Sequence, residues 1–142
     1  MRIVQKYGGT SVGTIERMRA VASRLIATQQ AGHEVIAVVS AMSGETNRLT
    51  SLASDASSNP SPREMDVLLA TGEQASVALL AMTINAMGGN AQSFLGYQIN
   101  MLTDGDHQRA RIQAVNKSGI DSALSAGCIP IVAGFQGVDK AG

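Results

Sequence analysis

Four short apolar runs are separated along the chain by longer segments with helical periodicity. Runs of this length, bounded by Gly, Ser or polar residues, predict buried strands. They lie at residues 3–7, 35–39, 91–95 and 129–133. No element is predicted for residues 96–111.

Between these runs, apolar residues recur at spacings of three and four, which predicts helices on residues 15–26, 49–56, 65–87 and 120–126. Gly32 is placed to end the first helix, and Gly88-Gly89 to end the third. The third has a start signal, because Ser61-Pro62-Arg63-Glu64 is a capping box with Pro at the first helical position. It is apolar on nearly every side, so we expect it to be buried. Alternating strands and helices predict an α/β fold with a largely parallel sheet, whose ligands bind at the carboxyl ends of strands.

Composition narrows the possible classes. The chain has 142 residues, 44% of them hydrophobic, and acids and bases balance at 11 each. A balanced charge favours neither a nucleic-acid partner nor an anionic membrane. Residues 74–103 carry no charge but are interrupted by Gly, Asn and Gln, so they make a poor membrane span. The single Cys128 and the lack of an apolar leader fit a cytoplasmic protein.

The loop after the first strand contains Lys6, Gly8, Gly9, Thr10 and Ser11. Glycines at a strand-to-helix turn let backbone N–H groups approach an anion, and the following helix N-terminus adds a favourable dipole. The spacing matches neither a dinucleotide fingerprint nor a Walker A loop. A solvated glycine turn is the alternative, but the adjacent lysine favours a phosphate cradle in which Lys6 offsets charge on a transferring phosphoryl group.

Polar side chains near the second loop suggest a substrate site. Ser40 and Thr46 flank the loop after residues 35–39, where their hydroxyls either cap the next helix or bond a substrate. Glu73 lies within the apolar third helix, and no Lys or Arg occurs between Glu64 and His107. A buried carboxylate needs a partner. That partner is a Lys or Arg distant in sequence, or the ammonium group of a bound amino acid. His33 and His107 are expected to be isolated surface residues.

Four segments together resemble the aspartate kinases of the amino-acid kinase family. They are Lys6-Tyr7-Gly8-Gly9-Thr10-Ser11-Val12, Val39-Ser40-Ala41-Met42-Ser43-Gly44-Glu45-Thr46-Asn47, Leu69-Ala70-Thr71-Gly72-Glu73-Gln74 and Val132-Ala133-Gly134-Phe135-Gln136-Gly137. They occur in the family's order and cover the chain from end to end. The resemblance implies a three-layer α/β/α fold with a mainly parallel open sheet.

The resemblance also implies an activity, the ATP-dependent phosphorylation of the aspartate side chain to aspartyl 4-phosphate, on the route to lysine, threonine and methionine. It implies that Lys6 is catalytic, that Lys6, Gly8, Gly9, Thr10 and Ser11 bind phosphate, and that Ser40, Thr46 and Glu73 bind aspartate. Residues 1–142 would be the N-terminal, substrate-side part of the kinase domain. The nucleotide-binding half, most Mg²⁺ contacts and the regulatory ACT domains would belong to the rest of an oligomeric parent enzyme.

Two other functions stay open at this point. One is another kinase of the same family, acting on acetylglutamate, glutamate or a nucleoside monophosphate. The other is a non-catalytic module that binds an amino acid, although such a module has no need of a phosphate cradle.

Overall fold

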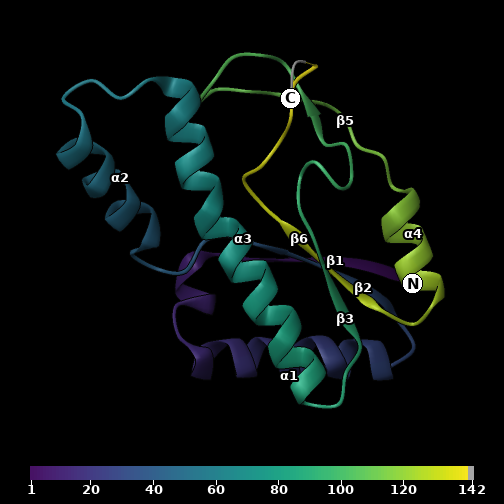
Figure 1. Ribbon diagram of the computed structural model, residues 1–142. Coiled ribbons are helices and arrows are strands. Elements are labelled where there is room, and N and C mark those ends of the chain that lie inside the picture. Colours follow the sequence, from purple (N-terminus) through teal and green to yellow (C-terminus); the bar gives the residue numbers. More distant parts are fainter. Residues whose placement is uncertain (141–142) are drawn as a thin grey trace.

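The main sheet has four parallel strands in the order β1-β2-β6-β3, seen at the centre of Figure 1. The computed structural model describes residues 1–140. The strands are β1 (Arg2–Tyr7), β2 (Glu34–Val39), β3 (Ala91–Phe94) and β6 (Ile129–Ala133). The predicted α/β fold with a parallel sheet is therefore confirmed. Because β1, β2 and β6 run the same way, the loops after them meet at one edge.

Each predicted helix is present, and three of the four begin two to four residues earlier than the apolar period indicates. The helices are α1 (Ile15–Gln30), α2 (Glu45–Ala56), α3 (Pro62–Ala86) and α4 (Ser118–Ser125). Polar first turns have no apolar period, which explains the difference. The start signal of α3 is confirmed, since the Ser61 side chain accepts a hydrogen bond from the Glu64 N–H. The stop at Gly32 is also confirmed, with φ of 87° one residue beyond the C-cap.

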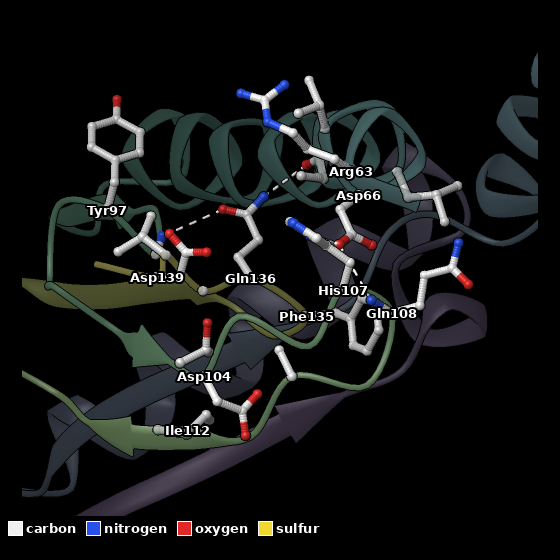
Figure 2. Close-up of a pocket in the computed structure, with 18 of the residues that line it drawn as sticks. Arg63, Asp66, Tyr97, Asp104, His107, Gln108, Ile112, Phe135, Gln136 and Asp139 are labelled. Atoms are coloured by element: carbon white, nitrogen blue, oxygen red, sulfur yellow. Dashed lines mark hydrogen bonds and ion pairs between the residues drawn. The ribbon is translucent and has the colours of Figure 1, made fainter. Parts of the chain in front are cut away.

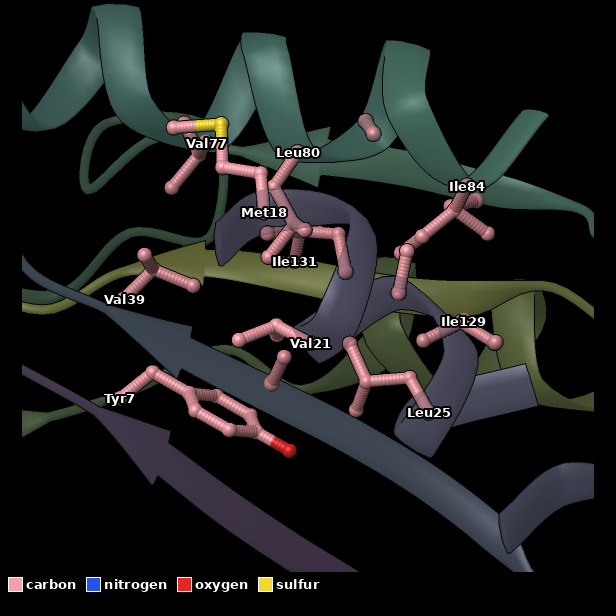
Figure 3. Packing of buried hydrophobic residues seen from close by; sticks show 14 of the residues in the cluster. Tyr7, Met18, Val21, Leu25, Val39, Val77, Leu80, Ile84, Ile129 and Ile131 are labelled. Carbon is pink, nitrogen blue, oxygen red and sulfur yellow. The ribbon is translucent and has the colours of Figure 1, made fainter. Parts of the chain in front are cut away.

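Helices cover both faces of the sheet, as the three-layer prediction requires. On one face, α1 and α3 pack over the larger core, in which Met18, Leu25, Leu80 and Ile84 are completely buried (Figure 3). On the other face, α4 covers a smaller cluster that includes Phe94. Burying one Leu or Ile side chain contributes about 1.5–3 kcal/mol. The larger core therefore supplies most of the stability that holds the sheet edge in place.

The expectation that α3 is buried on nearly every side is wrong. Its sheet-facing residues are buried, but Val67 and Met82 are 54% and 64% exposed. Within residues 1–140, α3 is the one helix long and apolar enough to cross a membrane by length and composition. In this fold it packs one face against α1, α2 and the sheet.

The segment for which no element was predicted forms part of a small antiparallel hairpin, β4 (Leu102–Thr103) and β5 (Ile112–Ala114). The register shifts within β4, and Asn100 and Gln108 have positive φ. All three residues of β5 are exposed. Such a hairpin has neither apolar alternation nor glycine turns at its left-handed positions, so the sequence pattern does not reveal it.

Candidate functional site

The loops after β1, β2 and β6 form a loop cluster, defined as residues 8–13, 40–44 and 134–137. Hydrogen bonds fix them to one another through the backbone. The Ser40 N–H donates to the Tyr7 carbonyl at 3.1 Å, and the Gly134 N–H donates to the Val39 carbonyl at 3.0 Å. The Ser43 N–H donates to the Gly9 carbonyl at 3.1 Å. The cluster brings together residues more than 90 positions apart in sequence.

The glycine loop is packed tightly against the second loop. A Cβ on Gly9 would lie 2.7 Å from the Ala41 carbonyl oxygen, too close for any side chain. Gly8 has no atom within 4 Å of its own Cβ position, so its surface is open to a ligand. Arg17 holds the loop from outside, because its Nη1 donates to the Thr10 carbonyl at 2.6 Å.

A short helix that was not predicted lies between Gly8 and the first predicted helix, which begins at Ile15 as expected. Gly8 is the N-cap of a four-residue 3-10 helix, η1 (Gly9–Val12), and α1 begins later with Thr14 as its N-cap. The N-terminus of α1 therefore follows directly after Gly13, the last glycine of the loop. Thr10 and Ser11 are exposed on η1.

The second loop ends at Gly44, which has φ of 83° and is itself the N-cap of α2. The capping alternative for Ser40 and Thr46 is therefore wrong, since neither side chain caps α2. Ser40 is half-buried at the end of β2, and Thr46 is exposed in the first turn of α2. Ser40 thus lies in the loop cluster, and Thr46 lies two residues beyond it.

Glu73 is 7% exposed on the sheet-facing side of α3. Its Oε2 atom has no hydrogen-bond partner among residues 1–140. Burial raises the pKa of the Glu73 carboxyl above its ordinary value. The backbone N–H groups of Ala41 and Gly134, and then the charge of Lys6, lower this pKa without cancelling the effect of burial. The carboxylate thus lies beside the loop cluster with one oxygen unsatisfied.

Lys6 is the cation that acts on Glu73, and it comes from the end of β1, 67 positions away in sequence. Lys6 itself is exposed, and the described residues form no ion pair between its ammonium and Glu73. The structure therefore brings Lys6, the glycine loop and Glu73 to one place but leaves the two charges separate. A ligand with a negative and a positive group would fit between such partners.

Gly72, the residue before Glu73, has no open space around it. A Cβ there would lie 3.2 Å from the Ala41 side chain and 3.3 Å from the Glu45 side chain. Gly72 lets α3 approach the second loop and the start of α2. That close approach places Glu73 against the Ala41 backbone.

A cavity of about 410 Å³ adjoins the loop cluster, between α3, the β4–β5 hairpin and residues 134–139 (Figure 2). Gln74, Gly134 and Phe135 are among the residues that line it. Phe135 is 69% exposed, and Gln136 forms hydrogen bonds with both α3 and the β3–β4 connection. The sequence contained both residues in the motif Gly134-Phe135-Gln136-Gly137, but their roles depend on contacts that the motif does not show.

The expectation that His107 is isolated is wrong. Its Nδ1 lies 2.8 Å from Oδ2 of Asp66, and the same oxygen accepts from the Gln108 N–H (Figure 2). This contact joins the hairpin to the first turns of α3. His33 is half-buried between α1 and β2, and Cys128 is a buried free thiol whose pKa is raised by burial.

Residues 1–140 contain no group of three or more His, Cys, Asp or Glu that could hold a metal ion. The side chains of residues 1–140 therefore do not gather the carboxylate oxygens for a Mg²⁺ site of their own.

A model of the amino acid kinase family matches residues 1–142. The chain belongs to the amino acid kinase family. It is 50% identical over 140 residues to an aspartate kinase of Stutzerimonas stutzeri, a match that covers 99% of this chain and 34% of that protein. The crystal structure of aspartate kinase from Synechocystis superposes with a TM-score of 0.79 at 44% identity, covering 95% of this chain and 22% of that one.

The fold is also shared with E. coli aspartokinase III, solved in complex with aspartate and ADP. That comparison gives a TM-score of 0.83 at 22% identity and covers 100% of this chain and 42% of that one. The chain thus spans about a third of the length of the curated aspartate kinases that it matches. The family and the fold are therefore established for the chain.

Proposed function

We propose that this chain is the substrate-side part of an aspartate kinase. One observation supports this above the others: the buried Glu73 carboxylate, with one oxygen unsatisfied, lies beside the loop cluster and is influenced by the charge of Lys6. Aspartate supplies an ammonium group that can pair with Glu73. It also supplies a side-chain carboxylate that can accept the phosphoryl group. Identities near 50% to named aspartate kinases, over almost the whole chain, point to the same substrate.

The proposed reaction transfers the γ-phosphoryl group of ATP to the side-chain carboxylate of aspartate. A carboxylate oxygen forms a bond to the γ-phosphorus, the bond from that phosphorus to the β,γ-bridging oxygen breaks, and ADP leaves with the electron pair. The nucleophile is already ionised, so no general base has to remove a proton. Catalysis then consists of positioning and of stabilising charge on the transferring group.

Glu73, Ser40 and Thr46 are proposed to hold aspartate. The substrate ammonium would give the unsatisfied Glu73 oxygen a charged donor, which favours the ionised carboxylate that burial disfavours. Ser40 and Thr46 lie at the two ends of the second loop, where hydroxyl groups can donate to a substrate carboxylate. Binding of the ammonium therefore gives a partner to the buried Glu73 oxygen that has none in the ligand-free protein.

Lys6 and the glycine loop are proposed to hold the transferring phosphoryl group. The open surface of Gly8 admits a phosphate, and the tight packing of Gly9 fixes the turn that presents its backbone. Gly8, Gly9, Thr10 and Ser11 would contribute polar contacts, while Lys6 offsets the developing negative charge. Lys6 is exposed at the end of β1, so it can reach a group above the loop.

We further infer that residues 1–142 are the N-terminal, substrate-side part of the kinase domain. In the parent enzyme, the adenine and ribose pocket, Mg²⁺ contacts, ACT domains and oligomer contacts would come from other parts. The enzyme would work in the cytoplasm. On this basis the isolated 142-residue chain should show no aspartate-dependent release of ADP. Robust turnover by the isolated chain would contradict the proposal that the ATP-binding half lies outside residues 1–142.

The experiment is a substrate panel with a full-length enzyme carrying this sequence. ADP release and hydroxamate trapping of an acyl phosphate should both depend on aspartate. Trapping with acetylglutamate or glutamate instead, or transfer to a nucleoside monophosphate, would assign another activity of the family. Aspartate binding without any trapped acyl phosphate would indicate a non-catalytic binding module.

A further inference from the structure

Gln136 bridges three separate segments with one side-chain amide. Its Nε2 donates to the Ala70 carbonyl of α3 at 2.7 Å, and its Oε1 accepts from the Gly96 N–H at 3.4 Å (Figure 2). The partners are 66 and 40 positions away in sequence. Both ends of the amide are therefore used across the fold.

The bridge is close to Glu73 along both segments that it joins. Ala70 lies one helical turn before Glu73 on α3, so a carbonyl held at Ala70 limits movement of that turn. Gly134 lies two residues before Gln136, and its backbone N–H favours the ionised Glu73 carboxyl. Gln136 thus ties the helix that carries Glu73 to the loop that supplies one of its polar neighbours.

The packing around Gln136 leaves the loop little freedom. A Cβ on Gly96 would lie 3.1 Å from the Gln136 Cβ, and a Cβ on Gly137 would overlap the Thr103 side chain. The Val138 N–H donates to the Met101 carbonyl at 2.9 Å, and the Thr103 N–H donates to the Val138 carbonyl at 2.8 Å. Residues 134–138 are thereby held at both ends, with the Gln136 amide as the link to α3.

We propose that Gln136 is a positioning residue for aspartate, setting the distance between Glu73 on α3 and the Gly134 backbone through its bond to Ala70. This inference rests on the proposed function. Gln136 does not touch the reacting atoms in this role. It acts through Glu73 and the loop, so its loss should weaken aspartate binding more than it slows phosphoryl transfer or weakens ATP binding.

The test uses the full-length enzyme with Gln136→Leu, which keeps side-chain bulk and loses both hydrogen bonds. The KM for aspartate should rise about 5- to 20-fold, the range expected for one or two lost hydrogen bonds, with the KM for ATP within about twofold. Gln98→Leu is the matched control, because Gln98 accepts a hydrogen bond from the nearby Leu95 N–H and bridges nothing distant. It should leave both KM values unchanged.

Gln136→Glu makes the hydrogen bond to Ala70 depend on pH. The pH dependence of the KM for aspartate then distinguishes a positioning role from a merely structural one. An ionised Glu keeps an acceptor for Gly96 but places a charge against the Ala70 carbonyl, whereas a protonated Glu can donate to that carbonyl. The KM of this variant for aspartate, relative to that of the wild type at the same pH, should fall as the pH is lowered. A flat ratio would contradict the role assigned to the Ala70 bond.

The outcomes separate this inference from the function on which it rests. A wild-type enzyme without aspartate-dependent turnover overturns the proposed function and this inference with it. A wild type that phosphorylates aspartate, together with a Gln136→Leu enzyme of unchanged aspartate KM, overturns the inference alone. An equal rise in both KM values with a lowered Tm would show a general structural role and would also overturn it.

Discussion

The loop cluster and the β4–β5 hairpin both border the cavity beside α3, but different contacts fix them. In the loop cluster, backbone groups bond directly to backbone groups, and Gly9 and Gly134 pack where a larger residue would press on a neighbouring carbonyl. The tip of the hairpin is joined to α3 through side chains, chiefly by Asp66 and His107. These two side chains are 34% and 42% exposed.

This difference indicates which region can support chemistry that depends on distance. A backbone-to-backbone contact involves no side-chain rotamers, whereas water weakens a contact between two exposed side chains. Lys6 and Glu73 both extend from elements fixed by the loop cluster. Substitutions there should therefore have large effects, and substitutions at the hairpin anchor should have small ones.

The largest effect is expected for Lys6→Ala in a full-length aspartate kinase carrying this sequence. Its kcat should fall about 10²- to 10³-fold, with a smaller change in the KM for aspartate, because Lys6 acts on charge in the transition state. Steady-state kinetics would measure both. Lys117→Ala, on an exposed lysine at the start of α4, should behave as wild type. A Lys6 variant within about twofold of wild-type kcat, well short of that range, would contradict the assignment.

Glu73→Gln should weaken aspartate binding about 10- to 100-fold and leave ATP binding nearly intact. The change keeps the shape of the side chain but removes a charged partner of the substrate ammonium. Calorimetry with each ligand separately would show it, with Glu64→Gln at the exposed start of α3 as control. If ATP affinity fell while aspartate affinity held, Glu73 would belong to the nucleotide side.

Gly9→Ala should destabilise the protein by about 1–3 kcal/mol, the usual cost of overpacking. Its Cβ would meet the Ala41 carbonyl at 2.7 Å, whereas a Cβ on Gly8 would meet nothing within 4 Å. Gly8→Ala is therefore the control, and its stability should match that of the wild type. Denaturant unfolding would test the pair. Equal stability of the two variants would show that the loop cluster can shift to accommodate a Cβ at Gly9. The loop cluster would then be no more rigid than the hairpin.

The stability of the ligand-free protein should also depend on Glu73 and on pH. Because burial raises the Glu73 pKa, the folded state binds more protons than the unfolded state, whose carboxyl titrates near 4.5. Stability from this group is therefore present below pH 4.5 and is lost as pH rises through the raised pKa. Glu73→Gln should lack this loss and have a higher Tm at neutral pH. The effect of Glu73→Gln on stability should be smaller than the effect of Gly9→Ala, because protonation of the carboxyl limits the free-energy cost of burying it.

The smallest effect is expected for Asp66→Ala at the hairpin anchor. Loss of an exposed pair costs less than about 1 kcal/mol. Amide hydrogen exchange should nevertheless accelerate across residues 104–111, because Asp66 accepts from both His107 and Gln108. Asp55→Ala on α2 is the control. Unchanged exchange in the hairpin would show that the Asp66 contact does not hold it.

The sequence by itself determined the order of the main elements and the loops that matter. Apolar runs fixed the parallel strands, helical periodicity fixed α1 to α4, and the rule that ligands bind at the carboxyl ends of strands pointed to the loop cluster. The prediction that Glu73 is buried without a neighbouring cation followed from residues 65–106 alone, which contain no Lys or Arg. These features are local, so short-range pattern is enough to specify them.

Only the tertiary structure decided what surrounds those residues. It placed Lys6, Ala41 and Gly134 around Glu73, assigned Gly72 to helix packing, and added the short helix η1 between Gly8 and α1. It also joined Gln136 to Ala70 and His107 to Asp66, and it revealed a hairpin whose strands have no apolar period. Each of these contacts joins residues that are tens of positions apart or depends on one backbone angle. Sequence periodicity reports only which side of an element faces the core, so such contacts form no pattern that it can detect.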